Sequence, residues 1–531
     1  MSVTRKFFSY GPVDKDIHYY AERSELFSKA VHQLMGENPE KGGHYITVWA
    51  PRQCGKTWLM NNVLWQLSEN EKFHVLKLEL EYLKQEEDTD GIVSSVGQDI
   101  IRSLNLKNVQ VRNIKEFRNL FHKDVLDKPL ILIMDEFDAL NEKTINSIVS
   151  SFRYIYNARQ KDPNPSDKKE YLLHSLALIG VRSVLGIENV KGSPFNVQRS
   201  LHIPNLTFAE CEGMFRWYER ESGQKVEQPV IERVFYETQG QPGLIGWFGE
   251  LLTETYNKEP ENPITLQNFE YAFKMAVQVL PNNNILNIIS KARQEPYADT
   301  VLDLFKPGQK MLFRFDRPDL NYLYMNGVIG IEETGTDIFV KFASPFVQKR
   351  LFNYFSDDIF RYTGQLHEPF ADLSDVFPQD RMNMKNLMRT YENYLKCNRE
   401  WLFGDAPRRK DLRIFEAVFH FNLYRFLCDF LGTREGKVWP EFPTGNGKID
   451  LMIVYNEHKY ALEIKSWADE IAYEKALTQA ARYGLQLGLP EITLVFFVEN
   501  IDSKSREKYE KEITDEKSGV KVETVFVETG K

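Results

Sequence analysis

The stretch from His44 to Glu69, HYITVWAPRQCGKTWLMNNVLWQLSE, decides the fold of the first part of this chain. An apolar run, HYITVW, leads into the loop APRQCGKT and then into a helical pattern. This order is the setting in which GxxxxGK[ST] forms a phosphate-binding loop, because backbone N–H groups at a helix N-terminus face the anion. Ala50 stands where the pattern has glycine. We predict a nucleotide-binding unit; the alternative is a simple strand–helix turn.

We expect different residues of the loop to contact different parts of ATP and its magnesium ion. We expect the backbone of Gln53, Cys54 and Gly55 to surround the phosphates. Lys56 would reach the β- and γ-phosphates, and the hydroxyl of Thr57 would hold Mg²⁺.

A second motif, LILIMDE (residues 130–136), is an apolar strand that ends in two carboxylates. Asp135 would bind the magnesium, directly or through water, and Glu136 would polarise the attacking water. Asp138 is expected to cap the helix that follows. A solvated strand end is the alternative, and the upstream loop argues against it.

Arginines near a third strand are candidates for sensing the γ-phosphate. The apolar run LALIGVRSV (residues 176–184) carries Arg182 at its end, where a polar side chain can contact this group; a surface ion pair is the alternative. Arg153, Arg159 and Arg199 are candidates for an arginine finger across a subunit interface, and the sequence does not choose among them.

Composition restricts the class of protein. With 531 residues, 42% of them hydrophobic, the chain can fold into several domains. No apolar run approaches the roughly 18 residues of a membrane span, and no signal peptide is recognisable. The four cysteines lack paired spacing, so we expect a reducing, cytoplasmic setting. The net charge of −9 implies that any contact with nucleic acid is local.

Patterning along the chain predicts four regions. Strands and helices alternate in the first third, as expected for an α/β fold with a parallel sheet. A helical stretch follows, and then a short hairpin of GVIGIEE and DIFVKFA, which suits a winged helix. The last part reads as a separate α/β domain. The expected boundaries are an ATPase core at 1–205, a helical lid at 206–280, a winged-helix-like module with a linker at 281–380, and the final domain at 381–531.

The N-terminal two thirds resemble the AAA-like, STAND-type P-loop ATPases of bacteria and archaea. The segments that carry the resemblance are FSYGPVDKDIHYYAER, WAPRQCGKT, LILIMDEFDAL, LALIGVRSV, SPFNV (residues 193–197) and TQGQPGLIG (residues 238–246). The resemblance implies that Pro242, in a Gly-Gln-Pro turn of the helical lid, lies near the nucleotide. It also implies a nucleotide-dependent switch coupled to self-assembly into a homo-oligomer.

A second carboxylate set lies near the C-terminus, in GKIDLMIV (residues 447–454) and YALEIK (residues 460–465). If these form a hairpin, Asp450 begins one strand, and Glu463 and Lys465 share a face of the next. Carboxylate oxygens suit Mg²⁺ or Mn²⁺, which can activate water against a phosphodiester. We therefore predict that Asp450 and Glu463 are metal ligands and catalytic residues, with Lys465 orienting the water.

Three more residues fit this set. Glu416, in a preceding helical pattern, would reach the metal, and Gln479 and Tyr483 lie four apart on a following helix that would contact nucleic acid. The ordered combination resembles the PD-(D/E)xK nuclease superfamily, with Ile449 in place of the proline of the family name. The alternatives are an exposed hairpin with an ion pair and a nuclease fold that has lost activity.

The combined interpretation is an ATP-regulated, divalent-metal-dependent nuclease acting on DNA, in anti-phage defence or mobile-element biology. The basic stretch at 381–413 would guide the phosphate backbone, or serve as a solvated linker. The alternative is an ATP-driven signalling or scaffolding switch whose C-terminal domain binds nucleic acid or protein without cutting it.

Overall fold

The computed structural model describes residues 5–180, 198–305, 311–367, 371–409, 414–432, 434, 436–443 and 448–530. The chain forms two compact units. The N-terminal unit comprises residues 1–284 and 314–328, and the C-terminal unit comprises residues 285–313 and 329–531.

A parallel sheet of five strands, in the order β2-β3-β4-β1-β5, is the centre of the N-terminal unit. This arrangement confirms the predicted α/β fold with a parallel sheet. Every residue of β3 and β4 is buried, as their continuous apolar sequence predicts. The strands are β1 (Tyr45–Trp49), β2 (His74–Glu79), β3 (Leu130–Asp135), β4 (Leu173–Gly180) and β5 (Gln198–His202).

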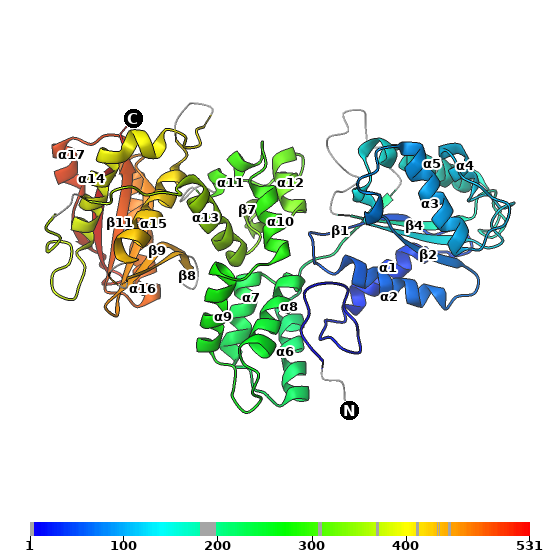
Figure 1. Cartoon of the computed structure of the whole chain (residues 1–531), viewed down its shortest axis with the longest axis horizontal. Coiled ribbons are helices and arrows are strands. Elements are labelled where there is room, and N and C mark those ends of the chain that lie inside the picture. The colour runs from blue at the N-terminus through cyan, green and yellow to red at the C-terminus, as the bar shows by residue number, and fades with distance from the viewer. Residues whose placement is uncertain are drawn as a thin grey trace. The chain divides into compact units, whose positions relative to one another are not determined.

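Helices cover both faces of this sheet (Figure 1). Side chains alternate along β3: Ile131 and Ile133 pack on the face of α1 (Ser24–Met35) and α2 (Lys56–Ser68). Leu132 and its even-numbered neighbours pack on the opposite face. That face is covered by α3 (Thr89–Ser103), α4 (Ile114–Asn119) and α5 (Glu142–Lys161).

The region after β5 is helical, as its sequence pattern predicts. Thr207 caps the first helix in a capping box. Its hydroxyl accepts the Glu210 N–H, and the Glu210 carboxylate accepts the Thr207 N–H. The helices of this region are α6 (Phe208–Ser222), α7 (Gln228–Thr238), α8 (Pro242–Glu250) and α9 (Leu266–Gln278). A π-helical turn, Leu251–Thr255, follows α8. The unit also includes α12 (Pro318–Met325).

The C-terminal unit begins with helices and the predicted hairpin. Strands β6 (Ile329–Thr334) and β7 (Asp337–Phe342) pair antiparallel, which confirms the hairpin. The helices of this part are α10 (Asn283–Ala292), which begins at the boundary between the units, α11 (Ala298–Leu304), α13 (Pro345–Ile359), α14 (Met384–Phe403) and α15 (Glu416–Gly432).

A mixed sheet of six strands, in the order β12-β13-β11-β10-β9-β8, forms the rest of this unit. Strands β8, β9 and β10 are antiparallel neighbours, whereas β10, β11 and β13 run parallel. The bounds are β8 (Lys437–Pro443), β9 (Lys448–Tyr455), β10 (His458–Ser466), β11 (Glu491–Val498), β12 (Glu512–Thr514) and β13 (Lys521–Glu528). Helix α16 (Glu470–Leu487) packs on the sheet, and α17 (Ser503–Tyr509) precedes β12.

One local prediction is wrong. Asp138 does not cap the helix after β3; it lies in a 3-10 turn, Phe137–Ala139. Asn141 is the cap of α5, since its side chain accepts a hydrogen bond from the Thr144 N–H at 2.9 Å. Within the described residues, no helix is long and apolar enough to cross a membrane.

Candidate functional site

The phosphate-binding loop closes at the N-terminus of α2. Gly55 directly precedes the helix with φ 87°, and Gln53 has φ 57°, so the loop uses left-handed backbone at two positions. The Lys56 ammonium donates to the carbonyls of Ala50 at 2.8 Å and Pro51 at 2.9 Å. The loop backbone therefore folds back onto the Lys56 ammonium. Alanine at position 50, where the pattern has glycine, is compatible with this conformation.

The two carboxylates predicted at the end of β3 lie beside this loop. Burial lowers the pKa of Lys56, and the charges of Glu136 and Asp135 oppose this effect, so the groups are close enough to interact. Glu136 has left-handed backbone with φ 54°, and its own pKa is raised by burial and by neighbouring carboxylates. Such a carboxylate is suited to polarise water.

A lysine that the sequence analysis did not select contacts Asp135. Lys77 on β2 places its ammonium 3.0 Å from Asp135 Oδ2, and both side chains are almost fully buried. The other oxygen, Oδ1, accepts the Glu136 N–H at 3.0 Å. The only signal in the sequence was a charged residue in the alternating run HVLKLEL. Lys77 thus holds the carboxylate expected to act near magnesium.

Helix α8 and the N-terminal segment converge on the loop from elsewhere in the sequence. The Gln241 amide donates to the Arg52 carbonyl at 3.0 Å, and the Gly243 N–H donates to the Gln53 carbonyl at 3.1 Å. The Gln53 side chain in turn donates to the Ser9 carbonyl at 3.0 Å. This arrangement places the Gly-Gln-Pro turn against the phosphate-binding loop.

An apolar cavity of about 70 Å³ adjoins the loop, and Pro242, Cys54 and Gly55 are among the residues that line it. Its aromatic lining comes from Phe8, Tyr19, Tyr20 and Trp58. These aromatic side chains therefore lie beside the loop that would hold the phosphates of a nucleotide. The sequence analysis quoted the aromatic N-terminal segment without assigning it this position.

The arginines considered for the γ-phosphate have different surroundings in the structure. Arg182 lies outside the described residues, as does the segment SPFNV. Arg159 is buried and donates to the carbonyl of Tyr171 and to the hydroxyl of Ser166, so it is a structural residue and not an arginine finger. Arg199 forms an ion pair with Glu37 at 2.9 Å.

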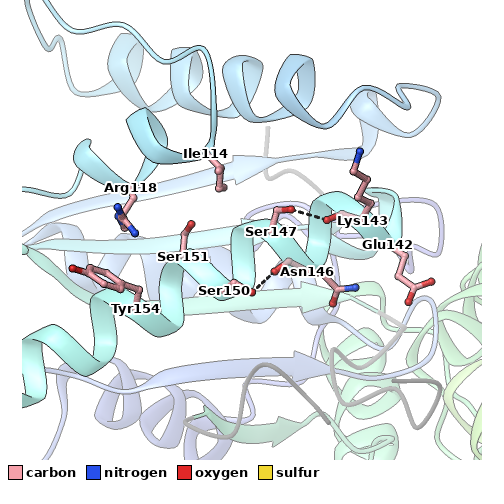
Figure 2. A pocket seen from close by; sticks show the side chains of 9 residues that line it. All are labelled: Ile114, Arg118, Glu142, Lys143, Asn146, Ser147, Ser150, Ser151 and Tyr154. Atoms are coloured by element: carbon pink, nitrogen blue, oxygen red, sulfur yellow. Dashed lines mark hydrogen bonds between the residues drawn. The ribbon is translucent and has the colours of Figure 1, made fainter. Parts of the chain in front are cut away.

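A wide polar hollow of about 940 Å³ runs along α5 (Figure 2). Arg118 lies over the ring of Tyr154 at 4.3 Å on one side. The Ser147 and Ser150 hydroxyls donate to carbonyls one helical turn earlier. None of the residues that line this hollow belongs to the phosphate-binding loop, so it is separate from the nucleotide site.

The second carboxylate set lies on β9 and β10. Asp450 Oδ2 accepts the Ile464 N–H at 2.6 Å, and Lys465 Nζ lies 2.5 Å from Glu463 Oε1. Asp450 is 8% exposed and Glu463 is 2% exposed. Burial and the nearby Asp450 charge raise the pKa of Glu463 to about 8, although Lys465 opposes the shift. Glu463 Oε2 has no hydrogen-bond partner among the described residues.

The other three predicted residues point to the same region. Glu416, at the start of α15, accepts a hydrogen bond at 2.5 Å from the hydroxyl of Ser466, which follows Lys465. On α16, the Gln479 amide donates to the Tyr483 hydroxyl at 2.9 Å. Burial lowers the pKa of Lys465, but the charges of Glu463 and Asp450 raise it further, and Tyr483 is close enough to add to this rise.

Two buried residues near Asp450 were missed. His420 lies on α15 one turn after Glu416, and Glu441 lies on β8. Ligand atoms of His420, Glu441 and Asp450 all lie within 4.8 Å of one another. Helical spacing from Glu416 is a signal for His420, whereas nothing in the local sequence identifies Glu441.

Several residues of the basic stretch form ion pairs within the C-terminal unit. Arg389 pairs with Glu392 and Glu510. Lys396 pairs with Glu392 and Glu528 at 3.6 Å and 3.5 Å. These cations are therefore partly neutralised by the fold and contribute less to a surface for phosphates.

Comparison with known proteins identifies the first part of the chain. Residues 8–255 match the family model described as an AAA-like domain. The N-terminal part is an AAA-like P-loop ATPase domain. No curated protein matches the sequence.

Similar solved structures include a Walker-type ATPase of Pyrococcus abyssi, with a TM-score of 0.44 and 15% identity, covering 65% of this chain and 99% of that one. The Aeropyrum pernix ORC1 protein in complex with DNA has a TM-score of 0.33 and 14% identity, covering 64% and 94%. The Thermotoga maritima RuvB Holliday junction branch migration motor has a TM-score of 0.34 and 12% identity, covering 60% and 92%.

Proposed function

We propose that this protein is an ATP-regulated, divalent-metal-dependent nuclease that acts on DNA. The observation that carries the proposal is the group of two buried carboxylates, Asp450 and Glu463, with the part-buried Lys465 paired to Glu463, in a chain that also has a P-loop ATPase domain. Two carboxylates are rarely buried side by side, with a single part-buried lysine beside them, without a functional reason.

The ATPase domain supplies the regulation. Lys56 and the backbone of residues 53–55 would bind the phosphates, and Thr57 and Asp135 would hold Mg²⁺. Glu136 would orient and polarise the attacking water. Because α8 contacts the phosphate-binding loop through Gln241 and Gly243, we propose that region 206–280 acts as the lid and responds to the nucleotide.

The carboxylate site would perform the cleavage. Asp450 and Glu463 provide buried anionic oxygens on neighbouring strands, and an unpartnered oxygen of Glu463 fits a cation such as Mg²⁺ or Mn²⁺. A cation bound there supplies activation of water and charge stabilisation. Lys465 would orient the water, and Glu416 would hold the cation from the helix side. Gln479 and Tyr483 would contact the nucleic-acid backbone.

The remaining parts of the proposal concern assembly and biology. We propose that the hairpin β6–β7 belongs to a winged-helix-like module within residues 281–380, and that residues 381–531 form a nuclease domain of the PD-(D/E)xK type. Nucleotide-dependent homo-oligomers acting in the cytoplasm, in anti-phage defence or mobile-element biology, would suit this combination.

One observation favours a second function. The net charge is −9, and Arg389 and Lys396 are engaged by carboxylates of the fold. A surface of this kind suits a protein partner better than a phosphate backbone. The alternative is therefore an ATP-driven signalling or scaffolding switch whose C-terminal domain does not cleave.

A cleavage assay separates the two functions. Purified protein is incubated with plasmid, linear DNA, single-stranded DNA or RNA, with Mg²⁺ or Mn²⁺, with and without ATP. We expect Glu463→Gln and Lys465→Ala to abolish cleavage, whereas Lys459→Ala, an exposed lysine on the same strand, should cleave like the parent. Cleavage that survives Glu463→Gln would refute the nuclease assignment.

The ATPase assignment has its own test. Lys56→Ala should abolish ATP hydrolysis, because the substitution removes the lysine that would contact the β- and γ-phosphates. Turnover at the parental rate in this variant would refute the assignment. ATP hydrolysis without cleavage of any substrate would favour the switch.

A further inference from the structure

Three carboxylates lie side by side across the antiparallel strands β8, β9 and β10. The ladder pairs Pro440 with Leu451 and Phe442 with Ile449. Glu441, which has left-handed backbone with φ 53°, stands between these pairs and so lies across from Asp450. On the other side of β9, the pair Leu451–Leu462 places Glu463 next to Asp450 in the same way. Asp450 is therefore the middle member of a row whose outer members are Glu441 and Glu463.

Without nearby positive charge, this row of carboxylates would destabilise the folded protein. Like charges directly opposite each other on neighbouring strands are destabilising, and burial strengthens the repulsion. Glu441 is 6% exposed. Lys465 pairs with Glu463 on one flank and Lys448 pairs with Glu441 on the other. Two lysines offset two of three carboxylates, and Asp450 between them accepts the Ile464 N–H at 2.6 Å.

His420 supplies an independent observation on the Glu441 side. Its ring is 1% exposed, and neither ring nitrogen makes a hydrogen bond of good geometry among the described residues. Burial lowers the pKa of His420, and the charges of Asp450 and Glu441 and a weak contact with the Asp450 backbone oppose this effect. Buried polar groups normally make good hydrogen bonds, so a buried imidazole without one, beside two carboxylates, indicates room for a further partner. The ligand atoms of His420, Glu441 and Asp450 lie within 4.8 Å of one another, which is compatible with a shared cation.

We propose that His420, Glu441 and Asp450 bind a second divalent cation, next to the one expected between Asp450 and Glu463. One imidazole nitrogen and two carboxylates form a mixed set that suits Mn²⁺ or Zn²⁺ better than Mg²⁺ or Ca²⁺. Asp450 would bridge the two positions. The inference deepens the proposed function because Asp450 belongs to both sites, but binding of the cation does not itself require cleavage of nucleic acid.

Mn²⁺ binding to the full-length chain tests the inference. The titration follows the electron paramagnetic resonance signal of free Mn²⁺ and is run without nucleotide, because the P-loop cation also needs phosphate oxygens. We expect the parent to bind two ions per chain. Glu441→Gln should weaken one of them at least about tenfold. Glu457→Gln, an exposed glutamate in the turn before β10, should match the parent.

A spectroscopic signature of the parent adds a readout that requires no variant. Mn²⁺ bound to the tag-free parent should show ¹⁴N coupling from an imidazole ligand, and His420→Gln should lose it while His458→Gln keeps it. A parent spectrum without nitrogen coupling would overturn the inference, as would unchanged Mn²⁺ affinity in Glu441→Gln.

The two proposals fail in different ways. Mn²⁺ binding that needs Glu441 and His420, in a protein that cleaves no nucleic acid, would refute the nuclease and leave the cation site standing. Cleavage that needs Glu463, with Mn²⁺ binding unaffected by Glu441→Gln, would refute the second cation and leave the nuclease standing.

Discussion

Replacing Lys77 with methionine should destabilise the edge of the ATPase sheet. A second substitution, at Asp135, should then restore most of the lost stability. In the parent, the Lys77 ammonium lies 3.0 Å from Asp135 Oδ2, and the two side chains are only 6% and 3% exposed. Methionine preserves most of the volume of the lysine stem but removes the charge. Among the described residues, the substitution therefore leaves the buried carboxylate with one hydrogen bond, from the Glu136 N–H at 3.0 Å, and with the charge of Lys56 nearby.

The size of the effect follows from these contacts. Removing one partner of a buried ion pair costs about 3–5 kcal/mol, because the other charge stays buried without compensation. The Glu136 N–H still stabilises the Asp135 carboxylate, so we expect the lower end, about 3 kcal/mol. Asp135→Asn in the Lys77→Met background removes the uncompensated charge, and most of the loss should be recovered.

Native-state hydrogen exchange suits this prediction, since a chain with several domains does not unfold in one step. Peptides from β2 and β3 should exchange about a hundredfold faster in Lys77→Met, because 1.4 kcal/mol corresponds to a factor of ten. Peptides from β11 and β13 of the C-terminal unit serve as the internal control and should not change.

The double variant decides the outcome. If β3 exchanges in Lys77→Met as it does in the parent, the ion pair does not stabilise the sheet. If adding Asp135→Asn produces a further loss instead of a recovery, the two residues act independently and the reasoning from a buried pair is refuted.

Three further predictions concern the two sites. Gly243→Ala should weaken ATP binding, since the added Cβ would lie 2.6 Å from a side chain of the phosphate-binding loop, whereas Gly213→Ala, with open space around it, should not; equal affinities would contradict this. Trp58→Ala should weaken ATP binding about tenfold by removing an aromatic ring from the cavity beside the phosphate-binding loop; calorimetry measures the affinity, with Trp65→Ala, exposed on the same helix, as the control. The pKa of Glu463 is raised to about 8, so the metal-free protein should lose stability as pH rises from about 5 to 8; Glu463→Gln should flatten this dependence of the melting temperature, and an unchanged slope would exclude Glu463 as its source.

Local patterns predicted most of the fold. The runs around β1, β2, β3 and β4 are apolar or alternating, and each lies in the parallel sheet as expected. The phosphate-binding loop and the hairpins β6–β7 and β9–β10 were also recognisable. These features depend on residues close in sequence, because backbone periodicity and turn chemistry act over a few residues.

The sequence by itself therefore determined where each chemical group lies on its own element: Lys56 at a helix N-terminus, Asp135 at a strand end, and Glu463 beside Lys465 on one face. Only the tertiary structure decided which elements meet. Strand order placed Lys77 against Asp135, and strand register placed Glu441 opposite Asp450. The physical reason is that burial, desolvation and pairing between distant segments arise when sheets and helices pack, and no pattern within one segment encodes its partner.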